Sequence, residues 1–137
     1  MSVTVSEFST SGRRRRGSSV FAHQAFAEWR HRGRRLTAIA RWSPWALGDW
    51  IIAGERAFGE RVDAVVAELG IETGEAAELA RVAQRFPPGR RRRGLSFSHH
   101  AAVADLEPAE AERLLVLSEA SGWTVKRLQR EVRQARR

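Results

Sequence analysis

The chain contains no cysteine, which excludes disulfide bridges and thiolate metal ligands. Its longest apolar run, around residues 50–53, is far too short to span a bilayer. The N-terminal segment also lacks the apolar stretch of a signal peptide. These absences predict a cytoplasmic protein with no membrane partner.

The sequence also lacks the patterns on which most enzyme classes depend. It has no tyrosine, no cysteine nucleophile, no glycine-rich phosphate loop after a strand and no metal-ligand spacing. His99 and His100 are adjacent, so on a helix they point about 100° apart and do not easily share one ion. We therefore expect no enzyme activity, no metal and no cofactor. A nucleotide-cleaving site made of His99, His100 and Asp105 is the weaker alternative.

Positive charge is abundant and comes almost entirely from arginine. The formal net charge is +8, and Lys126 is the only lysine. A basic balance of this size indicates a polyanionic partner, either a nucleic acid or an anionic membrane surface. Basic residues gather at 13–16, 30–35, 90–93 and in the C-terminal segment, and four such clusters in one chain favour double-stranded DNA.

Three regions differ in composition. Residues 1–19 are rich in serine, glycine and arginine without a helical period, which predicts a disordered basic tail. Residues 20–60 hold four of the five tryptophans and predict helices at 20–31 and 36–42 that supply core or a dimer interface. Residues 61–137 predict a helix-turn-helix with supporting helices. Because no strand-like alternation or internal repeat is present, the predicted fold class is an all-α, multi-helix DNA-binding domain.

Local signals predict where several helices begin and end. Ser43 is a candidate N-cap before Pro44, and Ser96 is another N-cap for a helix that reaches about residue 106. Gly70 fits the left-handed position after a helix, and Thr73 is the predicted N-cap of the next one.

Residues 61–86 have the pattern of a helix-turn-helix. An apolar stripe precedes Gly70, Ile71 fills the turn, and a second stripe follows. This spacing holds two helices at a steep angle, so that the second enters the major groove and presents its N-terminal side chains to the bases. The stripes are Val62, Val65, Val66 and Leu69, then Leu79, Val82 and Phe86. The predicted reading residues are Thr73, Glu75, Glu78, Arg81 and Arg85.

Acidic residues surround this helix. Residues 49–78 contain eight acidic and two basic side chains, a net charge of −6, which phosphates repel. A glutamate can accept from the cytosine amino group, so one or two acids at a reading edge are compatible with DNA. Phosphate contacts are therefore expected elsewhere, including one basic face of the last helix, whose alternative role is a merely solvated face. The predicted contacts are Arg90, Arg91, Arg92, Arg93, Ser96, Ser98, His99, His100, Lys126, Arg130 and Arg133.

Four motifs follow one another between about residues 42 and 132. They are Trp45-x-Leu47-Gly48-Asp49-Trp50, the helix-turn-helix, Leu95-Ser96-Phe97-Ser98-His99-His100, and Gly122-Trp123-Thr124-Val125. In order and spacing the chain resembles the LmbU-type regulators of actinomycete antibiotic clusters, and its distal helices are similar to those of ParB-type partition proteins. The resemblance implies a DNA-binding regulator at promoters of a biosynthetic cluster. The acidic segment 72–78 departs from the polar or basic recognition helix usual in that family.

We therefore predict a sequence-specific DNA-binding transcriptional regulator, associated with the nucleoid, that acts as a homodimer on two-fold sites. RNA polymerase is a further candidate partner. The alternative is a ParB-like partition or nucleoid-associated protein, which tolerates most sequences, whereas a regulator prefers its site by roughly 10³-fold or more. RNA binding is a third option, less favoured because no sheet with stacking aromatics is expected.

Overall fold

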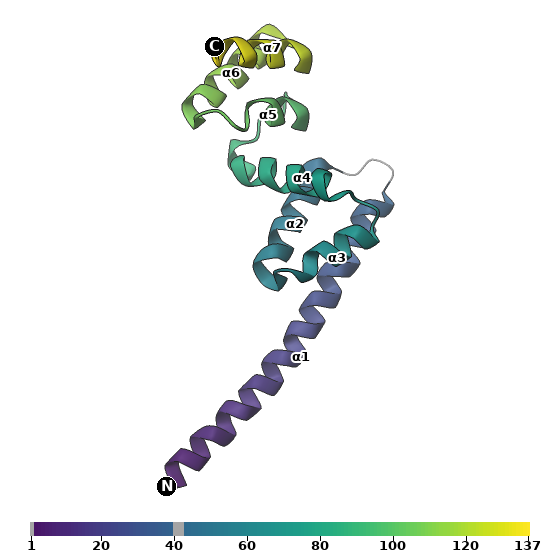
Figure 1. Ribbon diagram of the computed structural model, residues 1–137, viewed down its shortest axis with the longest axis vertical. Coiled ribbons are helices and arrows are strands. Elements are labelled where there is room, and N and C mark those ends of the chain that lie inside the picture. The colour runs from purple at the N-terminus through teal and green to yellow at the C-terminus, as the bar shows by residue number, and fades with distance from the viewer. Residues whose placement is uncertain (1, 40–42) are drawn as a thin grey trace.

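The computed structural model describes residues 2–39 and 43–137, and the side chains from residue 20 onward. In these residues all regular secondary structure is helical, which confirms the all-α fold class (Figure 1). The prediction of a disordered tail at residues 1–19 lies outside the described side chains. The elements are α1 (Ser2–Ala38), α2 (Pro44–Phe58), α3 (Arg61–Glu68), α4 (Thr73–Arg85), the short 3₁₀ helix η1 (Pro88–Arg90), α5 (Phe97–Val103), α6 (Pro108–Ser121) and α7 (Val125–Ala135).

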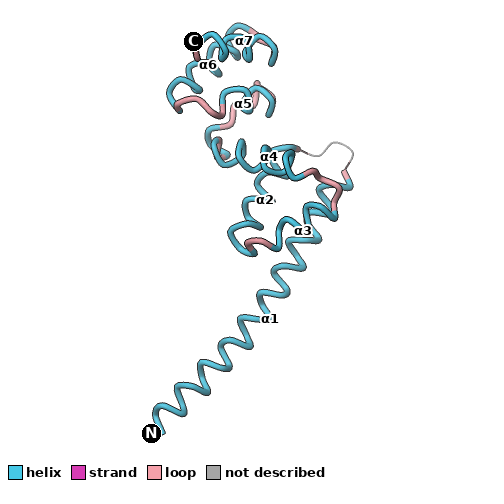
Figure 2. The backbone as a smooth tube through the Cα atoms, viewed as in Figure 1, coloured by secondary structure: helices cyan, strands magenta, loops and turns pink. Residues whose placement is uncertain are grey.

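Two neighbouring clusters of buried side chains organise the helices. The first core joins α1, α2, α3 and the start of α4, with Trp50, Val65 and Leu79 among its members. The second core joins the end of α4 with α5, α6 and α7, with Phe86 and Leu115 among its members. Because α4 contributes to both cores and packs along α2, it is the element that the two cores share (Figure 2). No helix in the described ranges is both long and apolar enough to cross a membrane.

The prediction of two short helices at 20–31 and 36–42 is wrong, because α1 continues without a break to Ala38. Gly33, which the sequence places inside a basic cluster, does not end the helix. It lies against the indole of Trp50, and a Cβ on Gly33 would come within 2.1 Å of that ring. The glycine therefore permits a close helix contact, and the basic cluster lies on a helix surface. Trp42 falls outside the described residues.

Trp29 and Trp50 form the centre of the contact between α1 and α2. Their rings are stacked with centroids 4.3 Å apart and an interplanar angle of 6°. Each indole N–H donates to the backbone carbonyl of the other tryptophan, at 2.8 Å and 2.7 Å. Gly54 lies against Trp29 as Gly33 lies against Trp50, so each helix contributes a Trp-x-x-x-Gly pair. These two tryptophans are 3% and 6% exposed and belong to the core.

Most of the predicted helix boundaries are confirmed. The Ser43 hydroxyl accepts from the Ala46 N–H, and the Ser96 hydroxyl accepts from the His99 N–H. Gly70 adopts the left-handed conformation, with φ +80°. The prediction that Thr73 is an N-cap is wrong: the extended residue before α4 is Glu72, and helical backbone begins at Thr73. The helix capped by Ser96 ends at Val103, earlier than predicted.

Candidate nucleic-acid interface

The α3–α4 corner has the buried side that its sequence predicts. Val62, Val65 and Val66 of α3 are buried, as are Leu79 and Val82 of α4. Two helices therefore meet at a turn that contains Gly70, and the start of α4 is left open to solvent. The predicted reading residues exposed on α4 are Thr73, Glu75, Glu78 and Arg85.

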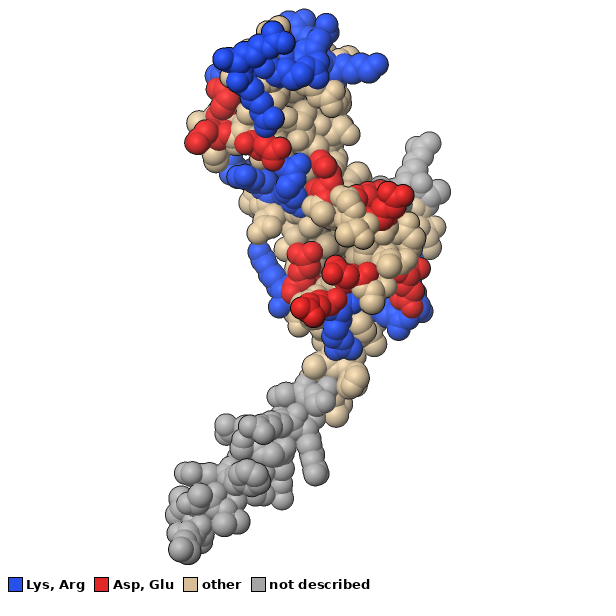
Figure 3. Space-filling view, viewed as in Figure 1, with Lys and Arg blue, Asp and Glu red and all other residues tan. Residues whose placement is uncertain are grey.

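The surface of this corner is acidic. Arg81, the predicted basic reading residue nearest the middle of α4, forms ion pairs with Asp105 and, at 3.3 Å, with Glu78. Its charge is therefore compensated within the protein. On the face seen in Figure 3, acidic side chains are spread over the part of the molecule built from α2, α3 and α4. Such a surface repels phosphates even where the shape of the corner would fit the DNA groove.

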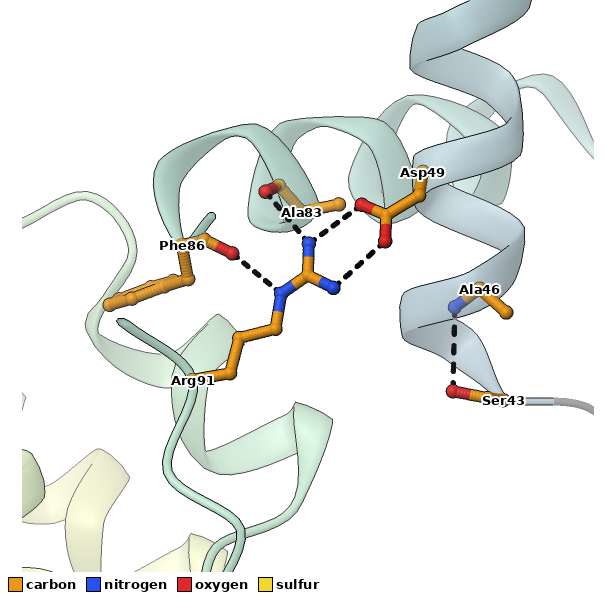
Figure 4. A network of polar contacts seen from close by, with 6 residues as sticks. All are labelled: Ser43, Ala46, Asp49, Ala83, Phe86 and Arg91. Atoms are coloured by element: carbon orange, nitrogen blue, oxygen red, sulfur yellow. Dashed lines mark hydrogen bonds and ion pairs between the residues drawn. The ribbon is translucent and has the colours of Figure 1, made fainter. Parts of the chain in front are cut away.

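The run of arginines at 90–93, which we call the basic loop, divides into two kinds of side chain. Arg91 is directed inward and its side chain is 13% exposed. Its guanidinium donates to both oxygens of Asp49 on α2, at 2.8 Å and 2.6 Å, and its Nε donates to the carbonyl of Phe86 at 2.6 Å (Figure 4). The same guanidinium lies 4.3 Å from the centroid of the Trp45 ring. Arg91 therefore links α2 to the end of α4 and has little freedom to contact a phosphate.

Arg92 is also held within the protein. Its guanidinium pairs with Glu112 at 2.9 Å and with Glu119 at 3.4 Å, both on α6. The hydrogen bond to Glu112 raises the pKa of Arg92 above its ordinary value. Arg90 and Arg93 are exposed, and neither makes an ion pair with any residue whose side chain is described. Only these two arginines of the loop are thus free to bind an external anion.

The two histidines hold loops together. His99 contacts the Ser96 hydroxyl through Nδ1 at 2.7 Å and the Trp123 carbonyl through Nε2 at 2.8 Å. His100 is fully buried, with Nδ1 2.8 Å from the Ser96 carbonyl, and its Nε2 accepts from the Arg92 backbone N–H at 3.1 Å. Of the predicted contacts at this helix start, Ser98 is exposed and Ser96 serves as the cap of α5. Among the described side chains no cluster could hold a metal ion.

The environment of His100 predicts a loss of stability in acid. Burial lowers the pKa of His100 below the ordinary 6.5, and the nearby His99, Arg91 and Arg92 lower it further. The hydrogen bond to the Ser96 carbonyl raises this pKa but does not cancel the decrease. The unfolded chain therefore binds a proton at His100 more tightly than the folded chain does. The contribution of His100 to the free energy of unfolding is complete above a pH of about 6.5 and is lost as the pH falls through the pKa of the folded state. Urea unfolding at pH about 7.5 and about 5 should give a lower free energy of unfolding at the lower pH. His100→Gln, which cannot titrate, should show a smaller decrease; an equal decrease would contradict the assignment.

The last helix carries three charges that form no ion pair with any described side chain. Leu128 and Val132 bury one side of α7 in the second core, whereas Lys126, Arg130 and Arg133 are exposed. Steps of four and three residues place these three cations on one side of the helix, which we call the α7 basic face. Within the described part of the chain none of them makes an ion pair. Figure 3 shows Lys and Arg side chains gathered over α7 at the end of the molecule opposite α1.

A second two-helix corner presents this face, and it lies at the motif Gly122-Trp123-Thr124-Val125 that the sequence analysis quoted without interpreting it as a helix-turn-helix. α6 ends at Gly122, which has φ +65°, and the Thr124 hydroxyl caps α7 by accepting from the Arg127 N–H at 3.1 Å. The signal for it was present, since Gly122-Trp123-Thr124 has the same order of glycine, apolar residue and polar helix start as the first turn. The two corners therefore differ in charge, and also in capping, since Glu72 makes no side-chain cap hydrogen bond at the start of α4.

Among curated proteins, the chain is similar to the transcriptional regulator NovE of Streptomyces niveus. The two are 32% identical over 105 residues, which is 77% of this chain and 48% of NovE. The chain thus spans about half the length of this relative. No family model matches the chain, and no solved structure matches it. The resemblance to LmbU-type regulators stays a prediction.

Proposed function

We propose that this protein is a DNA-binding transcriptional regulator and not an enzyme. The α7 basic face carries the proposal, because its three cations lie on a helix with a buried opposite side and form no ion pair with an acidic side chain in the described part of the chain. Similarity to NovE, itself a transcriptional regulator, supports the same function. The resemblance to regulators of antibiotic clusters extends the proposal to promoters of a biosynthetic cluster.

Duplex DNA suits this surface better than RNA does. An α-helix with its side chains is about 10–12 Å wide and fits the major groove of B-DNA, which is about 12 Å wide. The major groove of an RNA duplex is too narrow to admit side chains, and single-stranded RNA is commonly bound by aromatic residues on a sheet. The described residues form no sheet.

The two corners are proposed to make different contacts with DNA. The α7 basic face, with Arg90 and Arg93 of the basic loop, would bind phosphates. The exposed start of α4 would contribute contacts to base edges, where Glu75 can accept from a cytosine amino group. Arg91, Arg92 and His100 are assigned structural roles, since both guanidinium groups are ion-paired within the protein and His100 accepts from the Arg92 backbone N–H.

Recovery of sheared genomic DNA on the purified protein, followed by sequencing, tests this function. The salt concentration should be about 200 mM, because the non-specific electrostatic part of the affinity is then suppressed. We expect enrichment of a few fragments upstream of genes that share a two-fold motif, together with a dimer mass by light scattering on DNA. Uniform recovery would instead favour a partition or nucleoid-associated role, and no recovery would refute DNA binding. A monomer mass, both free and on DNA, would refute the homodimer alone.

A further inference from the structure

A groove of about 620 Å³ lies between the start of α2, the basic loop and the start of α5. Its apolar part is formed by Trp45, Leu95 and Phe97. The exposed residues Arg93 and Ser98 also line it, and we call this exposed part the mouth of the groove. Leu95 packs against the second core, and Phe97 packs against both cores. The groove is therefore placed where the two cores meet, and its size falls in the range of about 300–1,000 Å³ that is usual for small-molecule sites.

The aromatic floor of the groove is held in position from several sides. The Trp45 ring meets Phe97 edge to face with centroids 4.7 Å apart, and it meets His100 in the same manner at 4.9 Å. The Arg91 guanidinium lies 4.3 Å from the Trp45 centroid, and Arg91 is itself fixed by Asp49. Trp45 and Phe97 nevertheless remain half-exposed. Rigid, partly exposed aromatic rings offer a preformed surface on which a flat apolar group can pack.

The charge of the groove has one sign. Arginines 91, 92 and 93 all line it, and none of its lining residues is acidic. Arg91 and Arg92 are paired with carboxylates that lie outside the lining, whereas Arg93 is exposed and makes no ion pair with a described residue. Arg93 is thus placed to bind an anionic group, and the exposed hydroxyl of Ser98 can donate to the same group.

We propose that this groove binds a small, planar, aromatic acid. The ring system lies against Trp45, Phe97 and Leu95, and the acidic group pairs with Arg93 at the mouth. Trp45 and Leu95 pack against the second core and Phe97 packs against both, so a bound acid lies against the second core at its border with the first. No residue of the α7 basic face lines the groove, and Arg93 is the one residue that it shares with the proposed phosphate contacts. Because the test below uses no DNA, either proposal can fail while the other stands.

Two fluorescent probes test the proposal on the full chain. The first, 1-anilinonaphthalene-8-sulfonate, is an aromatic sulfonate whose flat naphthalene ring can pack on the groove; the second, N-phenyl-1-naphthylamine, has the same rings without the acid. We expect saturable binding of the sulfonate at one site per chain. Arg93→Ala should weaken it about ten-fold or more, because a charge-assisted contact is lost, and should change binding of the neutral probe less than about two-fold. Arg90→Ala is the matched control, since Arg90 is exposed in the same loop but does not line the groove, and it should change neither affinity.

A steric variant locates the binding. Ser98→Trp fills the mouth of the groove and should abolish binding of both probes, whereas Ser121→Trp at the exposed end of α6 should leave both unchanged. Circular dichroism should show that each variant keeps its helical content. The proposal is overturned if Arg93→Ala and Arg90→Ala weaken the sulfonate equally, since that outcome indicates general charge attraction. Binding of either probe that survives Ser98→Trp overturns it as well.

Discussion

Truncation of Trp50 to alanine is expected to lower the free energy of unfolding by about 3–5 kcal/mol, the usual cost of removing a buried tryptophan. The ring is 6% exposed and stacks on Trp29, and its N–H donates to the Trp29 carbonyl at 2.7 Å. Alanine removes the stacking and the hydrogen bond together, and opens a cavity between α1 and α2. Because small domains are stable by only about 5–15 kcal/mol in total, a large share of the stability is at risk.

Chemical unfolding followed by circular dichroism measures this loss, and Trp123→Ala is the matched control. Trp123 is half-exposed near the start of α7, so the same truncation there should cost clearly less. The glycines opposite the indoles give an independent measurement. Gly33→Ala and Gly54→Ala should each cost about 1–3 kcal/mol by overpacking, whereas Gly74→Ala, with open space around it, should be neutral or slightly stabilising. Equal effects at Gly54 and Gly74 would show that the Trp-x-x-x-Gly contact is not as described.

The features that the sequence predicted well are local ones. A cap such as Ser43 or Ser96 accepts a hydrogen bond from the backbone N–H three residues later. The sequence pattern that predicts the cap therefore lies within one helical turn of the contact itself. The valine stripe of α3 depends only on helical periodicity. The equal spacing of Trp29 with Gly33 and of Trp50 with Gly54 is also visible in the sequence. Its role could not be predicted, however, because it depends on the packing of α1 against α2, and the pattern within one helix does not reveal which other helix packs on it.

The candidate interface could be predicted only in part, because charge compensation depends on residues far apart in the chain. The arginines of the basic loop look equivalent in the sequence. In the structure, however, Arg91 pairs with Asp49, which is 42 residues away in the chain, and Arg92 pairs with Glu112, which is 20 residues away. His100 was predicted to contact DNA, but it is fully buried, and its Nε2 accepts from the Arg92 backbone N–H of the basic loop. On α7 the predicted DNA contact stays a prediction: Lys126, Arg130 and Arg133 are exposed, and the buried side of the helix is formed by the apolar residues Leu128 and Val132.

Replacement of Lys126, Arg130 and Arg133 by glutamine is expected to weaken binding to a duplex about 10²-fold at about 0.15 M salt. Each phosphate contact releases bound counterions from DNA, so the slope of log K against log salt should fall in magnitude by about three when these three contacts are lost. Fluorescence anisotropy of a labelled duplex at several salt concentrations gives both quantities. The substituted side chains are exposed, so the free energy of unfolding should change little.

The control for this variant removes the same charge from another surface. Arg32, Arg35 and Arg56 are exposed on α1 and α2, and with them replaced by glutamine the net charge falls by the same three units. If the α7 basic face is the contact surface, this second variant keeps most of the affinity and the original salt slope. If both variants lose affinity equally, the net charge of the chain and not the position of α7 governs binding, and the assignment of the interface fails. The comparison separates a fixed basic helix from a diffuse positive field, which the sequence alone does not distinguish.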